Sequence, residues 1–530
     1  MNEIINKYQI LTLGLLVTFT VLLIIPLLGI FFRFDFYDLG NLFKITGFSQ
    51  IILQSLYLSL CVSAISVSTA LVISFLIREQ MPIIQQVFIV CFTIPILIPT
   101  ISLGMGLLFL FSRSGPIFYL FGWRPNIFGF NGLLLGMVLY TLPFAVLQIF
   151  DTLRYEDSHL HSEAKALRLS ILSRLRSISL PRVKSAVKRA FFASFLISFT
   201  DFGINMMVGG QYRTLSLTLY QEIIGRMNFN RAAIISILMW IPLLLLFLFC
   251  MKGSVFNFKL NERGTTSAFY LKKKGVVISC IILAILAIIL LLPIGTFIAS
   301  SFRPTNLHNP DTLQNYKSLL NLNLTRYLKN SLIIATFGAV LGTIFSCLTA
   351  YVASKMNTLS AKFIKFIAVI PFSIPGLVIG LGLVLSYSSY DILFSTFIAL
   401  ICANIINFFG IPYFLFLNNF SLISNEVEIS AKVFRMNWLN VLSRIYLPQM
   451  KQTIVSSMLF YFTNSMITIS AAIILFRSQT MPLAILITQF EAQLLIFKAA
   501  SVTAIILFVN IIFKLIFYIY FRQKAEERYI

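Results

Sequence analysis

Twelve apolar runs, each long enough to cross a lipid bilayer as a helix, constrain the fold more than any other feature of the sequence. A crossing takes about 20 helical residues at about 1.5 Å each. The runs lie near residues 9–32, 49–76, 86–111, 132–150, 190–209, 233–251, 275–299, 331–354, 366–388, 394–417, 453–476 and 499–521. The first run is too long for a removable signal peptide, so it counts as a span. The sequence therefore predicts an all-α, polytopic membrane protein with about twelve transmembrane helices.

The composition excludes an ordinary soluble enzyme. Only 11% of the 530 residues are charged and 58% are hydrophobic, whereas a soluble domain has roughly 25% charged residues. The formal charge of +23 does not indicate nucleic-acid binding, because Lys and Arg punctuate the apolar runs and do not gather on one soluble segment. We expect a lipid bilayer around the chain and no nucleic acid among its partners.

The distribution of Lys and Arg predicts the orientation in the membrane, because positive charge near span ends is retained in the cytoplasm. With the N-terminus inside, cytoplasmic pieces hold 27 of the 41 Lys and Arg residues. Thirteen fall outside, and Lys514 lies near the inner end of the last run. Both termini of this multi-pass membrane protein are therefore predicted to be cytoplasmic.

An internal repeat divides the chain into two halves. The pattern Pro95, Pro99, Gly104, Gly106 recurs 276 residues later as Pro371, Pro375, Gly380, Gly382. Each half holds an even number of spans, so the sequence predicts two parallel six-helix repeats related by a pseudo-twofold axis along the membrane normal. The predicted divisions are a first repeat at 1–251, a cytoplasmic linker at 252–274 and a second repeat at 275–530.

Paired prolines and glycines are candidates for the transport path. A single Pro or Gly in a span is explained by kinking or close packing. A helix that loses backbone hydrogen bonds at the same depth in both halves favours a shared path. This reasoning selects Pro95, Pro99, Gly104, Pro371, Pro375 and Gly380.

Asp201 is the only one of the 18 acidic residues that falls inside a predicted span. Burying a carboxylate in a bilayer costs a few kcal/mol on insertion scales, so such a residue usually faces a partner or a watery path. A structural hydrogen bond to another helix is the alternative. Asn205 lies one turn away, and Asn464 was matched to Asp201 in the second half, so both join Asp201 as pathway candidates.

Two cytoplasmic loops carry matching amphipathic patterns, at 162–178 and at 429–445. Each pattern is predicted as one helix that ends at a Leu-Pro pair, Leu180-Pro181 and Leu447-Pro448. An interfacial helix on anionic lipid is the alternative, but the matched pair favours a symmetric partner. The predicted contact residues are Glu163, Ala164, Lys165, Arg168, Leu172, Leu180, Pro181, Glu428, Ala431, Lys432, Arg435, Leu439, Leu447 and Pro448.

No metal site is predicted. The six cysteines lie within or at the edge of spans without metal-like spacing, which indicates apolar packing. We expect His159, His161 and His308 to be solvated surface residues of loops and not metal ligands.

These loops resemble the coupling loops of bacterial ABC-importer permeases. The family motif runs Glu-Ala-Ala, then a glycine, then Leu-Pro. Here Ala164 and Ala431 stand at the second alanine, and Arg168 and Arg435 replace the glycine. The glutamates lie one place away, as Glu163 and Glu428.

Further motifs are similar to the fused permeases for ferric iron, thiamine and aminoethylphosphonate. They are Ser112-Arg113-Ser114-Gly115, Leu142-Pro143-Phe144, Asp201-Phe202-Gly203, Gly209-Gly210 and Arg213-Thr214-Leu215. The resemblance implies a non-enzymatic channel subunit of a bacterial plasma (inner) membrane, which moves a small solute into the cytoplasm by alternating access. It implies two copies of a cytoplasmic ABC ATPase that bind the ATP, so this chain needs no cofactor, and an extracytoplasmic substrate-binding protein.

The main alternative is a secondary active transporter with two six-helix halves. Such carriers typically place a glycine-aspartate-arginine motif between spans two and three, and Ile77-Arg78-Glu79-Gln80 does not match it. A membrane scaffold or sensor is a second alternative, but no appended domain is present to serve it. The sequence leaves the carried solute open.

Overall fold

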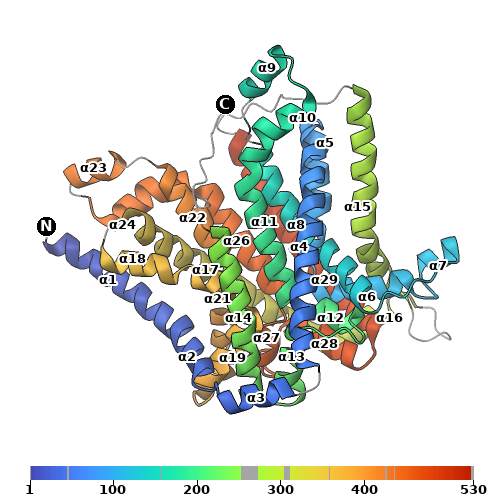
Figure 1. Cartoon of the computed structure of the whole chain (residues 1–530). Helices are drawn as coiled ribbons and strands as arrows, with labels where there is room; N and C mark the ends of the chain where they lie inside the picture. The colour runs from blue at the N-terminus through green and yellow to red at the C-terminus, as the bar shows by residue number, and fades with distance from the viewer. Residues whose placement is uncertain are drawn as a thin grey trace.

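The computed structural model describes residues 2–526 except 45–46, 155, 157, 252–272, 304–310, 357, 424–425 and 435. The described residues form helices joined by short connections, and no strand occurs among them (Figure 1). The all-α prediction is confirmed. The predicted linker 252–274 lies almost entirely outside the described residues, as do Arg435 and His308.

Among the described residues, eight helices are long and apolar enough to cross a membrane, or up to ten if each of two bent pairs counts as one span. The long ones include α4 (Phe48–Arg78), α8 (Phe130–Arg154), α14 (Phe229–Met251), α15 (Lys273–Ser301), α17 (Leu324–Lys355) and α29 (Ile496–Glu526). The first of the eight candidate spans in chain order runs without a break through α1 (Asn2–Phe19), η1 (Thr20–Ile24) and α2 (Ile25–Phe31). An arrangement of twelve spans therefore remains a prediction.

Two of the twelve predicted spans fall on helices outside this set. The run 190–209 lies mostly on α11 (Leu180–Thr200), whose first half carries four basic residues, and 453–476 lies mostly on α26 (Lys451–Ile467), which has only 17 residues. Both helices stop early because the chain turns extended at Asp201 and at Thr468.

The paired prolines interrupt two helices in the same way. In the N-terminal half the order is α5 (Pro82–Thr93), η2 (Ile94–Leu97) and α6 (Thr100–Phe111). In the C-terminal half it is α18 (Leu359–Ile367), η5 (Ile370–Ser373) and α19 (Gly376–Tyr387), with a bend of 112°. Ile98 and Ile374, which precede the second proline of each pair, are extended, because a proline ring disfavours the helical conformation of the residue before it.

Two three-helix groups form the centre of the molecule. α4 packs along α8 and α11, and α17 packs along α22 (Gly410–Leu422) and α26. α21 (Ile398–Asn407) joins α22 at a bend of 55°. The other helices are α3 (Phe36–Lys44), α7 (Pro116–Phe121), α12 (Gly203–Val208), α13 (Leu215–Tyr220), η4 (Gln221–Gly225), α16 (Gln314–Asn321), α20 (Asp391–Ser395), α27 (Ala472–Leu475) and α28 (Leu483–Ala492).

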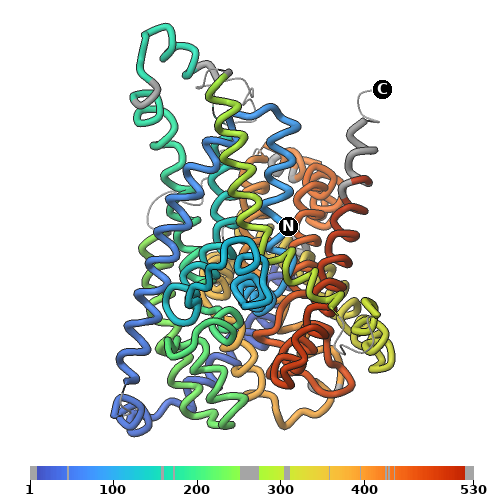
Figure 2. The backbone as a smooth tube through the Cα atoms, turned by 90° about the vertical axis from the view of Figure 1, so that its right-hand side faces the viewer, coloured from blue at the N-terminus to red at the C-terminus, as the bar shows by residue number. Residues whose placement is uncertain are grey.

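Helices of the two halves cross over onto each other. α15 packs on α6, and α2 packs on α19; Figure 2 shows α15, in yellow-green, running among blue and cyan helices of the N-terminal half. A glycine lies at each contact. A Cβ on Gly106 would lie 2.3 Å from the carbonyl oxygen of Pro293, and one on Gly382 would lie 2.7 Å from that of Pro26. Only glycine allows the backbones to approach so closely.

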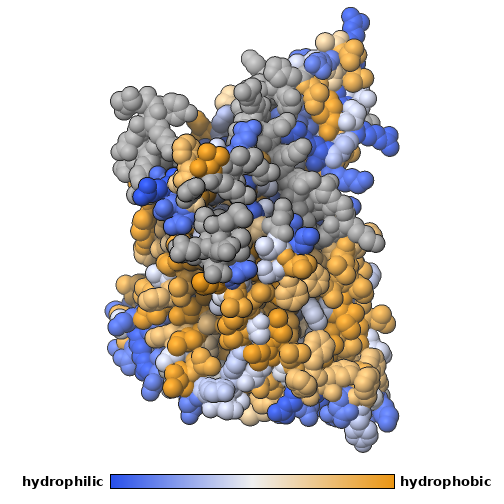
Figure 3. Space-filling view, turned by 90° about the vertical axis from the view of Figure 1, so that its left-hand side faces the viewer, coloured by the Kyte–Doolittle hydropathy of each residue, from blue (hydrophilic) through white to orange (hydrophobic). Residues whose placement is uncertain are grey.

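The outer surface carries a broad apolar zone. Figure 3 shows hydrophobic side chains across much of one face, with hydrophilic ones gathered toward its edges. On α15, Ile281, Ile285 and Ile288 are each more than half exposed. Such a surface suits a bilayer, where acyl chains replace water around the helices.

Candidate functional site

The two loops predicted to be cytoplasmic lie at one end of the molecule, away from α3, α12, α13 and α28 (Figure 1). The first contains α9 (Ser158–Ala166), α10 (Ile171–Arg174) and η3 (Leu175–Ser179), which continues directly into α11. The second contains α23 (Glu426–Val433), α24 (Trp438–Val441), η6 (Leu442–Tyr446) and α25 (Leu447–Gln449).

The prediction of one helix per loop was wrong. Each loop has a short helix, a turn, and a second helix that runs through Leu180-Pro181 or Leu447-Pro448. Proline lacks an N–H, but a wide π-helical turn precedes each pair, and proline is tolerated in the first turn of a helix. The second helix of each loop therefore continues through the Leu-Pro pair and does not end there.

The turn after the first short helix explains the motif position that Arg168 occupies. Arg168 has a φ of 53°, in the left-handed region that favours glycine. The Leu169 N–H donates to the Ala164 carbonyl at 3.0 Å, the six-residue closure of a Schellman cap. The second loop repeats this bond, from the Met436 N–H to the Ala431 carbonyl at 2.9 Å.

Exposed apolar side chains lie within both caps and shortly after the second one. Leu167 is 75% exposed, and Phe434, 267 residues later, is 76% exposed; Leu439 is 56% exposed. The predicted contact residues Ala164 and Ala431 are instead buried, with exposed fractions of 5% and 6%.

The other predicted loop residues fall into two groups. Glu163, Lys165, Arg168, Leu180, Pro181 and Pro448 are exposed, and Leu447 is half-buried. Arg435 and the side chains of Leu172, Glu428 and Lys432 lie outside the described residues.

A buried carboxylate ties the first loop to the bundle. Glu156 accepts hydrogen bonds from Arg78 at the end of α4, from His161 Nε2 on α9 at 3.2 Å, and from the Ser179 hydroxyl on η3 at 3.2 Å. Burial alone would raise the pKa of Glu156, but the His161 bond, the Arg78 charge and the Ser179 bond together hold that pKa below its ordinary value. Sequence reasoning missed this cluster because Arg78 lies 78 residues before Glu156 and because His161, expected at the solvated surface, is buried.

The second loop uses different chemistry at the matching place. Lys355, at the end of α17, donates from Nζ to the Ile423 carbonyl at 3.1 Å and lies 5.5 Å from the centre of the Tyr446 ring. Tyr446 also packs against Phe420 and Tyr351. The first loop is thus anchored by an ionic cluster and the second by an aromatic one.

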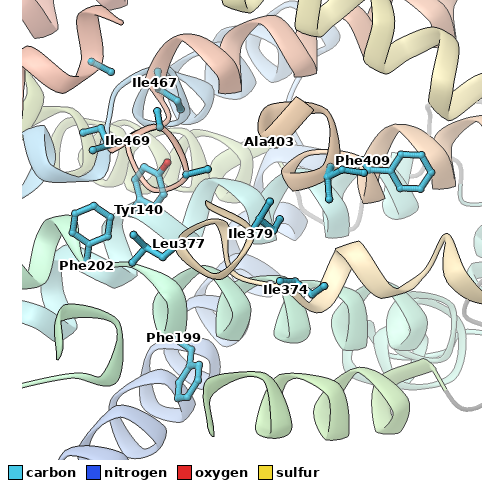
Figure 4. Close-up of a cluster of buried hydrophobic side chains, with 14 of the residues drawn as sticks. Tyr140, Phe199, Phe202, Ile374, Leu377, Ile379, Ala403, Phe409, Ile467 and Ile469 are labelled. Carbon is cyan, nitrogen blue, oxygen red and sulfur yellow. The ribbon is translucent and has the colours of Figure 1, made fainter. Parts of the chain in front are cut away.

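A central cavity of about 290 Å³ lies between the two halves. The N-terminal half contributes residues of α8, α11 and the start of α6, and the C-terminal half contributes residues of α19, α22 and α26. Five predicted pathway residues line the cavity: Pro99, Asp201, Pro371, Pro375 and Asn464. Figure 4 shows Tyr140, Phe202 and Ile469 in the apolar cluster at this place.

Asp201 lies where α11 ends. One carboxylate oxygen accepts from the Ile204 N–H at 2.9 Å, the Thr100 hydroxyl also bonds the carboxylate, and the Asp201 carbonyl accepts from Ser216 at 2.6 Å. The residue at the corresponding end of α26 is Thr468, four residues beyond Asn464. Asn464 lines the cavity but does not match Asp201 in position.

The four remaining pathway candidates do not line the cavity. Asn205 is buried and donates to the Thr214 hydroxyl. Pro95 is buried in η2, and Gly104 and Gly380 pack against Ile204 and Ala471, respectively. Gly104 and Gly380 therefore make the same contact in the two halves.

Each half contains one contact between a glycine and a hydroxyl side chain, but the two residue types occupy opposite positions of the contact in the two halves. Gly203 faces Thr100, and a Cβ on it would lie 2.5 Å from the Thr100 hydroxyl; Gly376 faces Ser470, whose hydroxyl would lie 2.4 Å from a Cβ on Gly376. Sequence reasoning missed Thr100, Tyr140 and Asn407 as cavity residues. Each is a common residue type in a span, so no sequence signal distinguishes it.

The sequence is similar to those of known proteins. Residues 330–525 match the family described as binding-protein-dependent transport system inner membrane component. Residues 330–525 of this chain belong to that permease family. The chain is an inner-membrane, multi-pass transport component and not an enzyme, and in such importers separate ATPase subunits bind the ATP. Among the described residues, no group of three or more His, Cys, Asp or Glu could hold a metal ion.

Several curated relatives align over much of the chain. A putative ferric transport system permease protein of Haemophilus influenzae is 22% identical over 452 residues, 81% of this chain and 71% of the relative. A ferric transport system permease protein of Actinobacillus pleuropneumoniae is 22% identical over 450 residues, 81% of this chain and 65% of the relative. A thiamine transport system permease protein of Haemophilus influenzae is 25% identical over 310 residues, 56% of this chain and 55% of the relative. The last two alignments span less than two thirds of the relatives' own lengths.

Proposed function

We propose that this chain forms the transmembrane channel of an ABC importer and moves a small solute into the cytoplasm by alternating access. The observation that carries the proposal is the matched pair of loop ends, each with a six-residue cap closure that contains an exposed large apolar side chain. Two similar protrusions suit a twofold pair of ATPase subunits. Family membership supports ATPase and binding-protein partners.

The arrangement of helices supports two parallel repeats, 1–251 and 275–530, with a linker between them. The helix breaks at the proline pairs, the Gly106 and Gly382 contacts, and the ends of α11 and α26 occur once in each half. Rocking of two such halves would open the central cavity first outward, toward a binding protein, and then inward. Both termini are cytoplasmic in this proposal.

The relatives' names leave three kinds of cargo under consideration. Two of the relatives above are ferric permeases and one is a thiamine permease; the motif resemblance adds a phosphonate-like solute. The external binding protein selects among them in this proposal.

Each exposed loop residue is proposed to enter a groove on one ATPase subunit. An amphipathic helix anchors in such a groove through a few apolar side chains. Leu167 and Phe434 are the most exposed large apolar residues of their loops. Leu439 extends the second contact, and Arg168 supplies positive charge beside the first.

The test replaces Leu167 or Phe434 by Asp, since a carboxylate in the desolvated centre of an interface is costly. We expect each single variant to lose co-purification of the ATPase and transport-linked ATP hydrolysis in proteoliposomes, while the permease still inserts. Tyr119→Asp is the control, because Tyr119 is 76% exposed on α7, away from the loops. Full association and coupling in the Leu167→Asp/Phe434→Asp double variant would contradict the proposal and bring the secondary transporter forward.

A further inference from the structure

We propose that the central cavity binds its cargo as a small organic cation, with Asp201 as the counter-charge and aromatic rings as the remaining walls. The inference rests on the proposed function and deepens it, because it names the class of solute that the membrane path accepts. It follows from the charge, the aromatic content and the size of the cavity.

The charge of the lining has one sign. All 27 residues that line the cavity belong to the described part of the chain, and Asp201 is the only ionisable acid or base among them apart from Tyr140. No Lys, Arg or His faces the space. An anionic solute such as a phosphonate would meet a carboxylate with no basic side chain to offset it, and like charges repel strongly where water is excluded.

The Asp201 charge is held in place without a cationic partner. Its carboxylate is fixed by the Ile204 N–H and the Thr100 hydroxyl at the start of α12. None of the salt bridges in the described part of the chain includes Asp201. Ionised acids inside membrane proteins are usually paired or serve a substrate path. A cationic solute would complete this pair.

Aromatic rings surround the same space. They come from both halves of the chain: Tyr140, Phe144, Phe202, Phe372, Phe408 and Phe460. The negative face of an aromatic ring attracts a cation, most strongly where the cation has lost its water. Rings also offer flat apolar surfaces, which suit an organic cation better than a hydrated metal ion.

The size and ligand set argue against a bare ferric ion as the bound species. A volume of about 290 Å³ lies near the lower end of the roughly 300–1,000 Å³ typical of small-molecule sites. A hard metal ion takes several oxygen ligands, and no group of three or more His, Cys, Asp or Glu in the described part of the chain could hold a metal ion. A single carboxylate among rings fits one organic positive charge.

The test measures equilibrium binding to the purified permease in lipid nanodiscs, without the ATPase or the binding protein. The probes are thiamine and tetraethylammonium as organic cations, and methylphosphonate as the anion. We expect both cations to bind and methylphosphonate not to bind. Asp201→Asn should weaken cation binding on the order of tenfold or more, since it removes a desolvated opposite charge, while asparagine can still cap α12.

A charge-relocation variant provides the matched control. Asn464 lines the same cavity from α26, so adding Asn464→Asp to Asp201→Asn should restore much of the cation binding. Binding of methylphosphonate by the unaltered protein, no binding of either cation, or equal cation binding in Asp201→Asn would each overturn the inference. ATPase co-purification is measured on the same proteins. Its retention in any of these cases would leave the proposed importer function standing, because docking and cavity chemistry involve different residues.

Discussion

Arg168 holds a backbone conformation that its side chain disfavours. A non-glycine residue in the left-handed region costs roughly 1–2 kcal/mol, and Arg168 has a φ of 53°. The resembling permeases carry glycine at this motif position, and the Schellman closure from Leu169 to Ala164 gives the physical reason. The sequence showed the replacement, but only the structure shows that the position is left-handed.

Replacing Arg168 with glycine should stabilise the first loop. We expect the free energy of unfolding to rise by about 1 kcal/mol, because the strain at the cap is relieved. The measurement is a thermal melt of the purified permease. The control is Lys165→Gly inside α9, which should lower stability by about 1 kcal/mol. A loss of stability in Arg168→Gly would contradict the assignment of strain.

The Glu156 cluster should make stability depend on pH. The pKa of Glu156 is lowered from an ordinary value of 4.5, so its stabilising effect is complete above pH 4.5 and is lost as the pH falls through the lowered pKa. Glu156→Gln removes the buried carboxylate charge that Arg78, His161 and Ser179 contact and should cost about 3 kcal/mol at pH 7.

The difference in stability between Glu156→Gln and the unaltered protein should stay constant from pH 6 to 4.5 and should shrink as the pH falls further, through the lowered pKa of Glu156. Melting temperatures of both proteins from pH 6 to below 4.5 measure it. A difference that stays constant over the whole range would show that the carboxylate is not the titrating group. Glu163→Gln is the matched control, because Glu163 is exposed on the same loop.

At the scale of elements, the sequence predicted which segments are helical more accurately than it predicted where each helix ends. The proline pairs correctly marked interrupted helices, because proline acts locally on its own chain. The loops were predicted as single helices, because an apolar periodicity continues across the turn and Arg168 gives no signal of a reversal. Asn464 was matched to Asp201 four residues too early, because the end of α26 at Thr468 has no distinctive residue.

The glycine contacts between helices give an element-scale prediction. Gly106→Ala would place a Cβ against the Pro293 carbonyl, where backbone cannot yield as a side-chain end does. Overpacking of this kind costs typically 1–3 kcal/mol, and we expect such a loss in a thermal melt, with a similar loss for Gly382→Ala. The control is Gly295→Ala on α15, the helix that carries Pro293. A Cβ on Gly295 would meet nothing within 4 Å, so this change should be neutral or stabilising. Equal effects at Gly106 and Gly295 would exclude the close approach as the cause.

At the scale of the whole molecule, the crossed packing could not be predicted from the sequence. The repeat was visible as matching residues, but the packing of α2 on α19 and of α15 on α6 joins segments hundreds of residues apart. No sequence pattern in α2 or α15 indicates which helix it packs against. In the same way the cavity required both halves at once, so Tyr140 and Asn407 became visible only when the bundle was assembled.

The proposed parallel orientation of the halves places both loops in the cytoplasm, and single cysteines test it. In a background without the six native cysteines, Ser173→Cys and Asn440→Cys lie exposed at matching places of the two loops. We expect neither to react with an impermeant thiol reagent added to intact cells, and both to react after the cells are opened. Tyr119→Cys and Leu320→Cys, exposed on α7 and α16, should react from outside. If the halves were inverted, one loop cysteine and one outer cysteine would exchange behaviour. Labelling of Asn440→Cys alone from outside would therefore reject parallel repeats while leaving the first loop in place, because the two loops are tested independently.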